Sequence, residues 1–275
     1  MNSDMQSEFT SCRSTATELA VRNSDSSSGT TSFSELRFTG EVLNFPERPQ
    51  IHLVQNRDRY FALKQFTPED APQPFFHQHP HLVSILSEEK RKDQVSYLLE
   101  YVPSTVFLKL ILHGAIPEAE ALAMFRQVCE AVRHLHAHGV HHGDIRPETV
   151  LIDETGSVKL TNLGTSQGLA TAKSKAQDVQ ALARLLHEML TNEAFQGSLA
   201  ASLSAPVAAL LRRVMANSPP VEALLQEPLV AGESSYETAV LSRLEKFLKP
   251  RVKSRVRPRP KRCGRRVSFD FVSRI

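Results

Sequence analysis

Hydrophobic positions follow different periods in the two halves of the chain. Before about residue 105 the apolar residues form short runs with strand character, at 51–54, 60–63 and 95–102. From about residue 119 onward they recur every three or four positions, the spacing of a helix that buries one face. Because strands come first and helices follow, the pattern predicts an α+β fold.

Three stretches carry the helical period most clearly, at residues 119–138, 178–191 and 206–230. The first predicts a buried face of Ala121, Met124, Phe125, Val128, Cys129, Val132 and Leu135, and the second a face of Val179, Leu182, Leu185, Leu186, Met189 and Leu190. The third is interrupted by Ser-Pro-Pro and predicts two helical segments. Two apolar triplets, 150–152 and 158–160, flank an Asp-Glu-Thr-Gly turn and predict a hairpin.

The two ends of the chain have a different composition. Residues 1–32 are rich in Ser and Thr and hold too few large apolar groups to offset the entropy of ordering, so we expect them to be disordered. The folded domain is predicted to cover 33–232, followed by a linker helix at 233–248 and a disordered basic tail at 249–275.

Charge divides the chain in the same way. The 275 residues carry a formal net charge of +3, with 41% apolar residues, enough for one sizeable core. Residues 249–275 hold 11 basic and one acidic residue, whereas the rest holds 22 basic and 29 acidic residues. The body is therefore acidic, and the basic excess belongs to the tail.

Several cellular settings are disfavoured. No apolar run reaches the roughly 18 residues of a membrane span, and the polar N-terminus lacks the apolar core of a secretory leader. The cysteines, Cys12, Cys129 and Cys263, are scattered and show no metal-ligand spacing, which favours reduced thiols. We expect a cytoplasmic or nuclear protein without a membrane partner.

Ordered motifs in the body resemble the eukaryotic protein-kinase family. Residues 140–151 read VHHGDIRPETVL, similar to the H-R-D-L-K-P-E-N catalytic loop, and 160–164 read LTNLG, where the family has D-F-G. Residues 61–64, FALK, resemble the V-A-I-K strand. The resemblance spans about residues 35–230 and implies a two-lobed kinase-like fold.

The resemblance also implies roles for single residues. Lys64 matches the lysine that pairs with phosphates, and His142 and Asp144 match the His and Asp of the catalytic loop. Asp178 matches the buried aspartate that opens the central helix and ties down the catalytic-loop backbone. A structural interpretation stays open: Lys64 can be an ordinary strand lysine, and His142 and Asp144 can serve packing and hydrogen bonding.

The departures from the family fall on the groups that hold metal and phosphate. Magnesium needs hard oxygen ligands, yet Asn162 replaces the D-F-G aspartate and Thr149 replaces the catalytic-loop asparagine. No glycine-rich loop precedes Lys64, and Gly143 replaces the arginine of H-R-D. These losses predict a pseudokinase with no catalytic residues, no cofactor and no bound metal.

Two structural elements of the family also lack room. Only 14 residues separate Lys64 from His79, which predicts a shortened C helix and an eroded N-lobe. Only 13 residues lie between Gly164 and Asp178, which leaves no space for an activation segment.

The tail carries a second motif. Arg266, Val267, Ser268 and Phe269 resemble the R-V-x-F docking motif of regulators of type 1 protein phosphatase. In an extended peptide alternate side chains point the same way, so Val267 and Phe269 can enter two apolar pockets while Ser268 faces away. Arg265 and Arg266 before Ser268 also make it a candidate phosphorylation site.

The leading hypothesis is a catalytically inactive kinase-like scaffold that binds an unidentified protein through its body and recruits type 1 protein phosphatase through its tail. One alternative is a residual atypical Ser/Thr kinase that works with Lys64 and Asp144. Another is a basic-tailed nuclear binding module without a phosphatase link. The tail lacks aromatic residues among its basic ones before Phe269, which disfavours nucleic acid as a specific partner.

Overall fold

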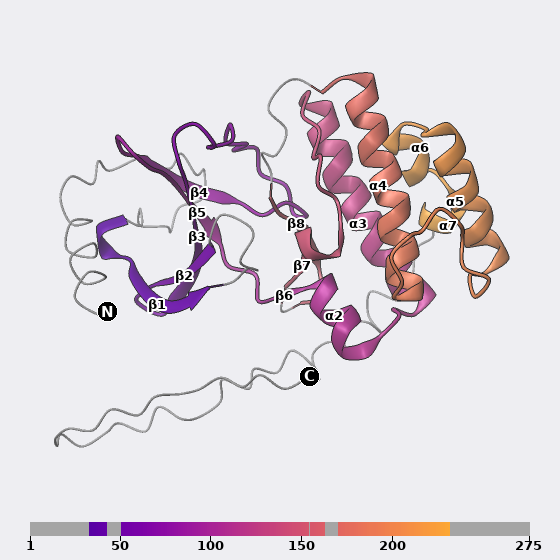
Figure 1. Cartoon of the computed structure of the whole chain (residues 1–275), viewed down its shortest axis with the longest axis horizontal. Helices are drawn as coiled ribbons and strands as arrows, with labels where there is room; N and C mark the ends of the chain where they lie inside the picture. Colours follow the sequence, from indigo (N-terminus) through magenta and orange to yellow (C-terminus); the bar gives the residue numbers. More distant parts are fainter. Residues whose placement is uncertain (1–32, 43–50, 154, 163–169, 232–275) are drawn as a thin grey trace, which may run out of the picture.

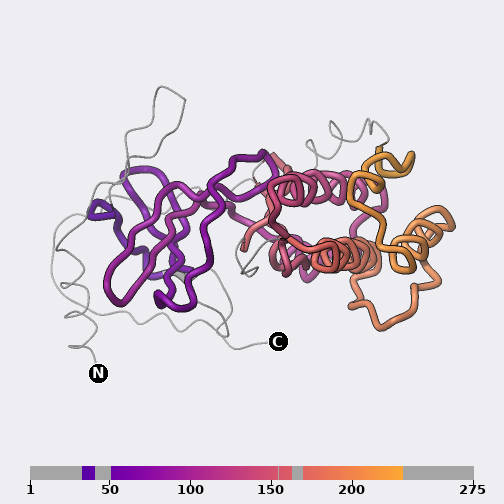
Figure 2. Tube along the Cα trace, turned by 90° about the horizontal axis from the view of Figure 1, so that it is seen from above, coloured from indigo at the N-terminus to yellow at the C-terminus, as the bar shows by residue number. Residues whose placement is uncertain are grey.

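The computed structural model describes residues 33–42, 51–153, 155–162 and 170–231. These residues form two lobes, a β-sheet lobe and a helical lobe, that lie side by side (Figures 1 and 2). The predicted α+β, kinase-like two-lobed architecture is confirmed. The linker helix expected at 233–248, the tail and the N-terminal 32 residues lie outside the described residues.

The first lobe is a five-stranded antiparallel sheet in the order β1-β2-β3-β5-β4. Its small core consists of Val54, Phe61, Leu63 and Leu98, which come from the three central strands of the sheet. The predicted strands around 51–54, 60–63 and 95–102 are all present. The strands are β1 (Arg37–Val42), β2 (Ile51–Asn56), β3 (Arg59–Phe66), β4 (Ile85–Lys90) and β5 (Val95–Glu100).

The segment that joins β3 to β4, residues 67–84, contains no helix, although every residue of it is described. We call this segment the connector. Its prolines have a fixed φ and no N–H, so they cannot continue a helix. The connector lies against the sheet, where the hydroxyl of Tyr97 donates to the carbonyl of Pro72 at 2.6 Å. The expectation of a shortened C helix is therefore wrong in detail: an extended strap takes its place.

The second lobe is built around two long helices, α3 (Glu118–Ala137) and α4 (Ala172–Thr191), which pack side by side (Figure 1). Every predicted core residue of these helices is buried except Leu190, which is partly buried against the core. Three further helices complete this part: α5 (Ala205–Asn217), α6 (Val221–Leu225) and α7 (Pro228–Ala231). The hydrophobic period therefore predicted this core residue by residue.

Two helical features differ from the prediction. Helix α4 begins at Ala172, because Thr171 caps it through a hydrogen bond from the N–H of Ser174, so Asp178 lies in its second turn instead of opening it. Helix α2 (Val106–His113) was not predicted. Thr105 caps α2. Three apolar side chains of this helix are exposed, those of Leu108, Ile111 and Leu112.

The predicted hairpin is present and lies where the two lobes meet. It consists of β7 (Val150–Ile152) and β8 (Val158–Leu160), with the two-residue β6 (Ser104–Thr105) beside β7. The connector pairs with β8: the N–H of Val83 donates to the carbonyl of Leu160 at 3.0 Å, and the N–H of Leu160 to the carbonyl of His81 at 2.9 Å. Residues 81–83 therefore join the connector to the strand that leads to Asn162.

Among the described residues, no helix combines the length and apolar character needed to cross a bilayer. Cys129 is a free thiol in the helical core, and burial raises its pKa well above the ordinary value. This matches its predicted role as a small core residue.

Candidate functional site

Lys64 lies on β3, where its ammonium group reaches across to the other lobe. Its Nζ donates to Oδ1 of Asn162 at 2.5 Å, a contact that spans 98 positions of sequence. The same Nζ lies 5.0 Å from the centre of the Phe66 ring, within range of a cation–π contact. The lysine therefore has a fixed position at the junction of the lobes.

Asn162 follows β8 and holds a left-handed backbone conformation, with φ of 69°. Asparagine adopts this region more readily than most residues because its short polar side chain can hydrogen-bond locally. Its Nδ2 donates to Oδ2 of Asp144 at 2.8 Å, while its Oδ1 accepts from Lys64. One neutral amide thus joins the lysine and the aspartate.

An amide is suited to this bridge in a way that a carboxylate is not. An ionised carboxylate only accepts hydrogen bonds, so it could bind Lys64 but would repel Asp144. The amide accepts on one side and donates on the other. The replacement of the D-F-G aspartate by Asn162 therefore adds an interaction as well as removing a charge.

Besides the neutral amide of Asn162, Asp144 has an ionic partner in the catalytic loop. Nε of Arg146 lies 3.1 Å from Oδ1 of Asp144 and 3.8 Å from an oxygen of Glu148. The side chain of Asp144 is 21% exposed, so this pair is partly screened by water. Arg146, which sequence reasoning did not single out, balances the charge of Asp144 next to Asn162.

Thr149, at the position of the catalytic-loop asparagine, is buried and directs its hydroxyl into the loop. Its Oγ1 donates to the carbonyl of Asp144 at 2.7 Å and accepts from the N–H of Arg146 at 3.1 Å. These contacts close the short turn of residues 147–149. The hydroxyl serves the shape of the loop.

His142 is fully buried beneath the loop. Its Nε2 lies 2.8 Å from the carbonyl of Thr161, and its Nδ1 accepts from the N–H of Asp144 at 3.1 Å. This pair of contacts fits a neutral imidazole with its proton on Nε2. Burial lowers the pKa of His142 below its ordinary value, although the bond to Thr161 and the charge of Asp178 raise it.

Asp178 anchors the same loop from below. It is 1% exposed and accepts from the N–H of His142 at 2.7 Å, the N–H of Gly143 at 2.8 Å and Nε2 of His136 at 2.8 Å. Burial alone would raise its pKa, but the hydrogen bonds from His136 and from the two backbone N–H groups lower it below the ordinary value. This is the position and the backbone pairing that the resemblance implied.

Besides Arg146, sequence reasoning missed two further partners, and one of them had a signal. His136 lies four residues after Val132, on the buried face of α3, and a buried polar side chain needs a partner. The other is Glu100, at the end of β5, which binds Nζ of Lys159 at 2.8 Å and accepts from the N–H of Ser84 at 2.7 Å. Glu100 therefore connects the sheet lobe to β8. This contact joins segments that are distant in sequence, so no local sequence pattern predicts it.

The arrangement does not fit the magnesium ion of family members. Magnesium takes hard oxygens at about 2.1 Å in a near-octahedral shell. Here the amide oxygen of Asn162 is bound to a cation, and the hydroxyl of Thr149 is turned into the loop. Within the described residues, no group of three or more His, Cys, Asp or Glu side chains is placed to hold a metal ion.

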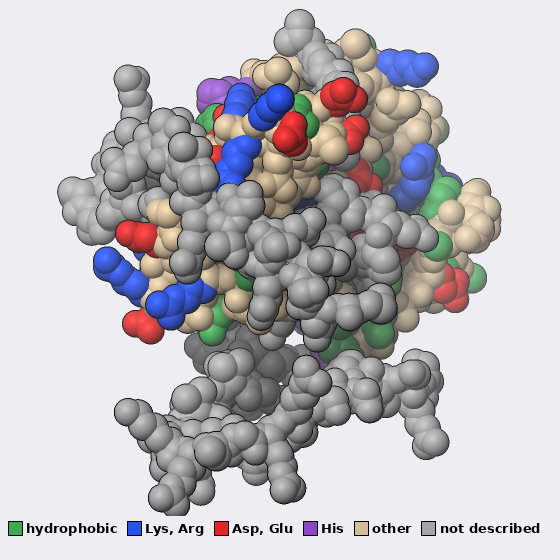
Figure 3. Space-filling view, turned by 60° about the vertical axis from the view of Figure 1, so that its left-hand side comes forward, with side chains coloured by type: hydrophobic (Ala, Val, Ile, Leu, Met, Phe, Trp, Pro, Cys, Tyr) green, Lys and Arg blue, Asp and Glu red, His purple; other side chains and the backbone are tan. Residues whose placement is uncertain are grey.

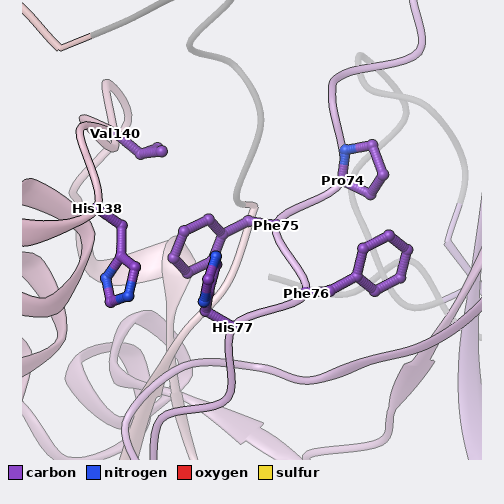
Figure 4. Close-up of a pocket in the computed structure, with 6 residues that line it drawn as sticks. All are labelled: Pro74, Phe75, Phe76, His77, His138 and Val140. Carbon is purple, nitrogen blue, oxygen red and sulfur yellow. The ribbon is translucent and has the colours of Figure 1, made fainter. Parts of the chain in front are cut away.

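A pocket of about 340 Å³ lies apart from these residues. Its lining comes from the connector and from the region after α3 and does not include Lys64, Asp144 or Asn162 (Figure 4). The docking residues Arg266, Val267 and Phe269, and Ser268 between them, lie outside the described residues.

Comparison with known proteins agrees with the fold and the loop. Residues 75–200 match the protein kinase domain family. The chain is 36% identical over 89 residues to a putative CBL-interacting protein kinase 13 of Oryza sativa subsp. japonica, covering 32% of this chain and 17% of that protein. It is 33% identical over 89 residues to a carbon catabolite-derepressing protein kinase of Saccharomyces cerevisiae, covering 32% and 14%.

A longer match, to CBL-interacting protein kinase 21 of Oryza sativa subsp. japonica, has 32% identity over 134 residues and covers 44% of this chain and 24% of that protein. Each of these matches spans less than a quarter of the relative's own length. Together with the two lobes and the anchored loop, they show that this chain contains a protein kinase-like domain.

Proposed function

We propose that this protein is a non-catalytic, kinase-like regulator whose body binds a partner protein and whose tail recruits type 1 protein phosphatase. The observation that carries the first half is the bridge of Asn162 between Lys64 and Asp144. The second half depends on the R-V-S-F motif of the tail.

Phosphoryl transfer by a kinase is mostly positioning and charge neutralisation, by a lysine on the phosphates, an aspartate near the accepting hydroxyl and magnesium between them. In this site the lysine and the aspartate are connected to each other. A nucleotide that used Lys64 would first have to break its hydrogen bond to Asn162, and Asp144 would keep Arg146 as its counter-ion. Catalysis would start from the loss of interactions that stabilise the junction of the two lobes.

The competing hypothesis of a residual kinase draws support from the retained Lys64 and Asp144 and from relatives that are named protein kinases. Purified full-length chain, with and without millimolar Mg-ATP, separates the two. A ligand at one hundred times its Kd stabilises the folded state by about 2.7 kcal/mol, which a thermal melt detects. We expect no shift and no phosphate transfer. A shift that Lys64→Ala removes would favour the kinase.

The basic-tailed nuclear module is the remaining alternative. On the face of the body in Figure 3, positive and negative side chains of the described residues lie interspersed, so they form no basic patch there that would extend the tail. A tail that served nucleic acid would bind by charge alone and lose affinity steeply with salt. We expect the phosphatase interaction to depend on Val267 and Phe269 instead.

The docking proposal is tested with the full-length chain and purified catalytic subunit of type 1 phosphatase. The double variant Val267→Ala with Phe269→Ala should lose binding, whereas Val272→Ala with Phe271→Ala, which has the same composition change nearby, should retain it. Equal affinity of both variants and the unchanged protein would mean that the motif is a chance match.

Phosphorylation of Ser268 sharpens the same test. A phosphate adds roughly 1.5–2 negative charges and draws Arg265 and Arg266 into local ion pairs. We expect binding to weaken by at least about tenfold, or roughly 1.4 kcal/mol. Unchanged affinity of the phosphorylated protein would remove the switch from the proposal without removing the docking.

A further inference from the structure

Five histidines from two distant segments gather between the connector and the end of α3. His77, His79 and His81 belong to the connector, and His134 and His138 to the last turn of α3 and the residue that follows it. Figure 4 shows His77, His138 and Phe75 side by side at one end of this group. We call these five side chains the histidine column.

The rings of the column form one continuous series. The centroid of His77 lies 4.2 Å from that of His138, which lies 4.3 Å from His134, which in turn lies 4.8 Å from His79. The planes of these neighbours are tilted by only 34–46°, and His81 closes the series edge-on at 5.6 Å from His79. The two rings of α3 are therefore held between rings of the connector.

The column lies between two fixed points of the connector. On one side Tyr97 binds the carbonyl of Pro72, and on the other Leu82 pairs with Leu160. Between them, Phe75 packs against His77 at 4.9 Å and against His138 at 5.8 Å. Since the connector contains no helix or strand of its own between these points, ring contacts hold this part of it on α3.

Few negative charges face the column. From α3, Glu130 reaches Nε2 of His81 at 3.6 Å, but it is shared with Arg126, and Arg133 adds a positive charge. From α4, Lys175 binds the carbonyl of His136 beside the column. At the start of β8, the carbonyl of Val158 and the hydroxyl of Ser157, which precedes the strand, approach His81.

The C-terminal end of α3 favours a single positive charge, because the negative end of the helix dipole lies there and Nδ1 of His138 lies 2.8 Å from the carbonyl of His134. Two protonated neighbours in the column, in contrast, would repel each other. The pKa of His79 is lowered to about 4, by burial first and then by His134, His81 and Arg133, with only Glu130 opposing. Burial also lowers the pKa of His134, followed by its neighbours His138 and His77 and by Arg133.

We propose that the histidine column is an acid-sensitive clamp, which holds the connector against α3 near neutral pH and releases it when stacked neighbours become protonated. A released histidine regains its ordinary pKa near 6.5, whereas His79 and His134 have lowered pKa values in the column, so acid favours the released state increasingly as pH falls below about 6.5. This inference goes beyond the proposed function and does not depend on it.

Release would have two local consequences. The 340 Å³ pocket is lined by the connector residues 74–77 together with His138 and Val140, so it would open, and Phe75 would gain exposure beside the already exposed Phe76. Movement of His81 would also reach Leu160, two residues before Asn162, through their backbone hydrogen bond. A fall in pH would then change the position of the connector and, through it, the contacts at the junction of the lobes.

The test is hydrogen exchange of the full-length chain at pH 7.5, 6.0 and 5.0, corrected for the intrinsic pH dependence of exchange. Peptides that cover residues 79–84 report the N–H groups of His81 and Leu82, which donate to Nδ1 and to the carbonyl of His79. These peptides should lose protection by at least about tenfold between pH 7.5 and 5.0, while peptides from α4 keep theirs. Constant protection of residues 79–84, or an equal loss in α4 that signals global unfolding, would overturn the proposal.

A variant separates protonation from other effects of acid. Nε2 of His134 is buried and has no hydrogen-bond partner among the described residues, so phenylalanine can replace its ring without removing a bond from it. His134→Phe with His77→Phe removes every tilted histidine–histidine pair of the column and leaves the edge-on pair of His79 and His81. We expect this variant to keep its protection at pH 5.0 within about twofold, and His113→Phe, at the end of α2, to behave like the unchanged protein. Loss of protection in the double variant equal to that of the unchanged protein would refute the clamp.

Discussion

The catalytic loop is held by two groups of residues that differ in burial and in how far they depart from the family. Below the loop, Asp178 lies buried and accepts three hydrogen bonds. Above it, the bridge of Lys64, Asn162 and Asp144 lies at a partly exposed junction. The lower group keeps the aspartate and the histidine that the family has at positions 178 and 142, whereas the upper group has exchanged a carboxylate for an amide.

The difference follows from the physical cost of change at each place. A buried carboxylate with three donors cannot be replaced singly, because the donors would be left without partners. At the junction, water and neighbouring side chains can compensate for a changed residue. A kinase-like fold can therefore be retained while the groups that serve phosphate and metal are altered.

Removing Asp178 should have the largest effect. Asp178→Ala would leave two backbone N–H groups and His136 unsatisfied in the core, and we expect it to lower the free energy of unfolding by about 3–5 kcal/mol. Asp144→Ala, at the partly exposed pair, should cost about 1 kcal/mol or less. Urea unfolding of both variants measures the comparison, and similar losses would mean that burial does not distinguish the two groups.

Much of this fold could be predicted, because its core follows the helical period. The buried faces of α3 and α4 were predicted correctly, since long amphipathic stretches place their apolar residues on one side. Helix α2 was not predicted because it is a short apolar run, and periodicity cannot distinguish such a run from a strand. The first turn of α4 is polar, so its start could be found only from the cap at Thr171.

The site was predictable only where the family resemblance applied. The pairing of Asp178 with the loop came from that resemblance, but Asn162 was interpreted only as a lost ligand. Its bridge joins three segments that are distant in sequence, and such contacts depend on how the lobes meet. The histidine column was not predicted for the same reason, because the connector histidines are 53 or more positions away in sequence from His134 and His138.

Acid should weaken the lower group through His142 before it affects Asp178. His142 is neutral in the folded protein and its pKa is lowered, so its contribution is complete above the unfolded value of about 6.5 and is lost as pH falls below it. The pKa of Asp178 is also lowered, but its contribution is lost only below its unfolded value of about 3.9. We expect the free energy of unfolding to decline from about pH 6.5 downward.

Urea unfolding from pH 7.5 to 5.0 measures this decline, and His142→Asn provides the control. Asparagine keeps an acceptor for the N–H of Asp144 but does not titrate, so the gap between this variant and the unchanged protein should narrow as pH falls. His79 and His134 also have lowered pKa values and so add to the same decline in the free energy of unfolding, and the His77→Phe, His134→Phe variant removes part of their contribution. A gap that stays constant with pH would show that His142 does not contribute.

Restoring the carboxylate above the loop should have the smallest effect and the most specific one. Asn162→Asp would place a second negative charge about 2.8 Å from Asp144, while keeping an acceptor for Lys64. We expect a loss of about 1 kcal/mol without magnesium, because the junction is partly exposed and Lys64 and Arg146 offset the repulsion. Asp144→Asn in the same chain should recover most of that loss, since an amide can again donate across the gap. Adding magnesium to Asn162→Asp should restore stability if two carboxylates suffice to hold the ion, and should leave the unchanged protein unaffected. If the unchanged protein gained stability with magnesium to the same extent as the variant, the amide bridge would not be what distinguishes this site from that of a kinase.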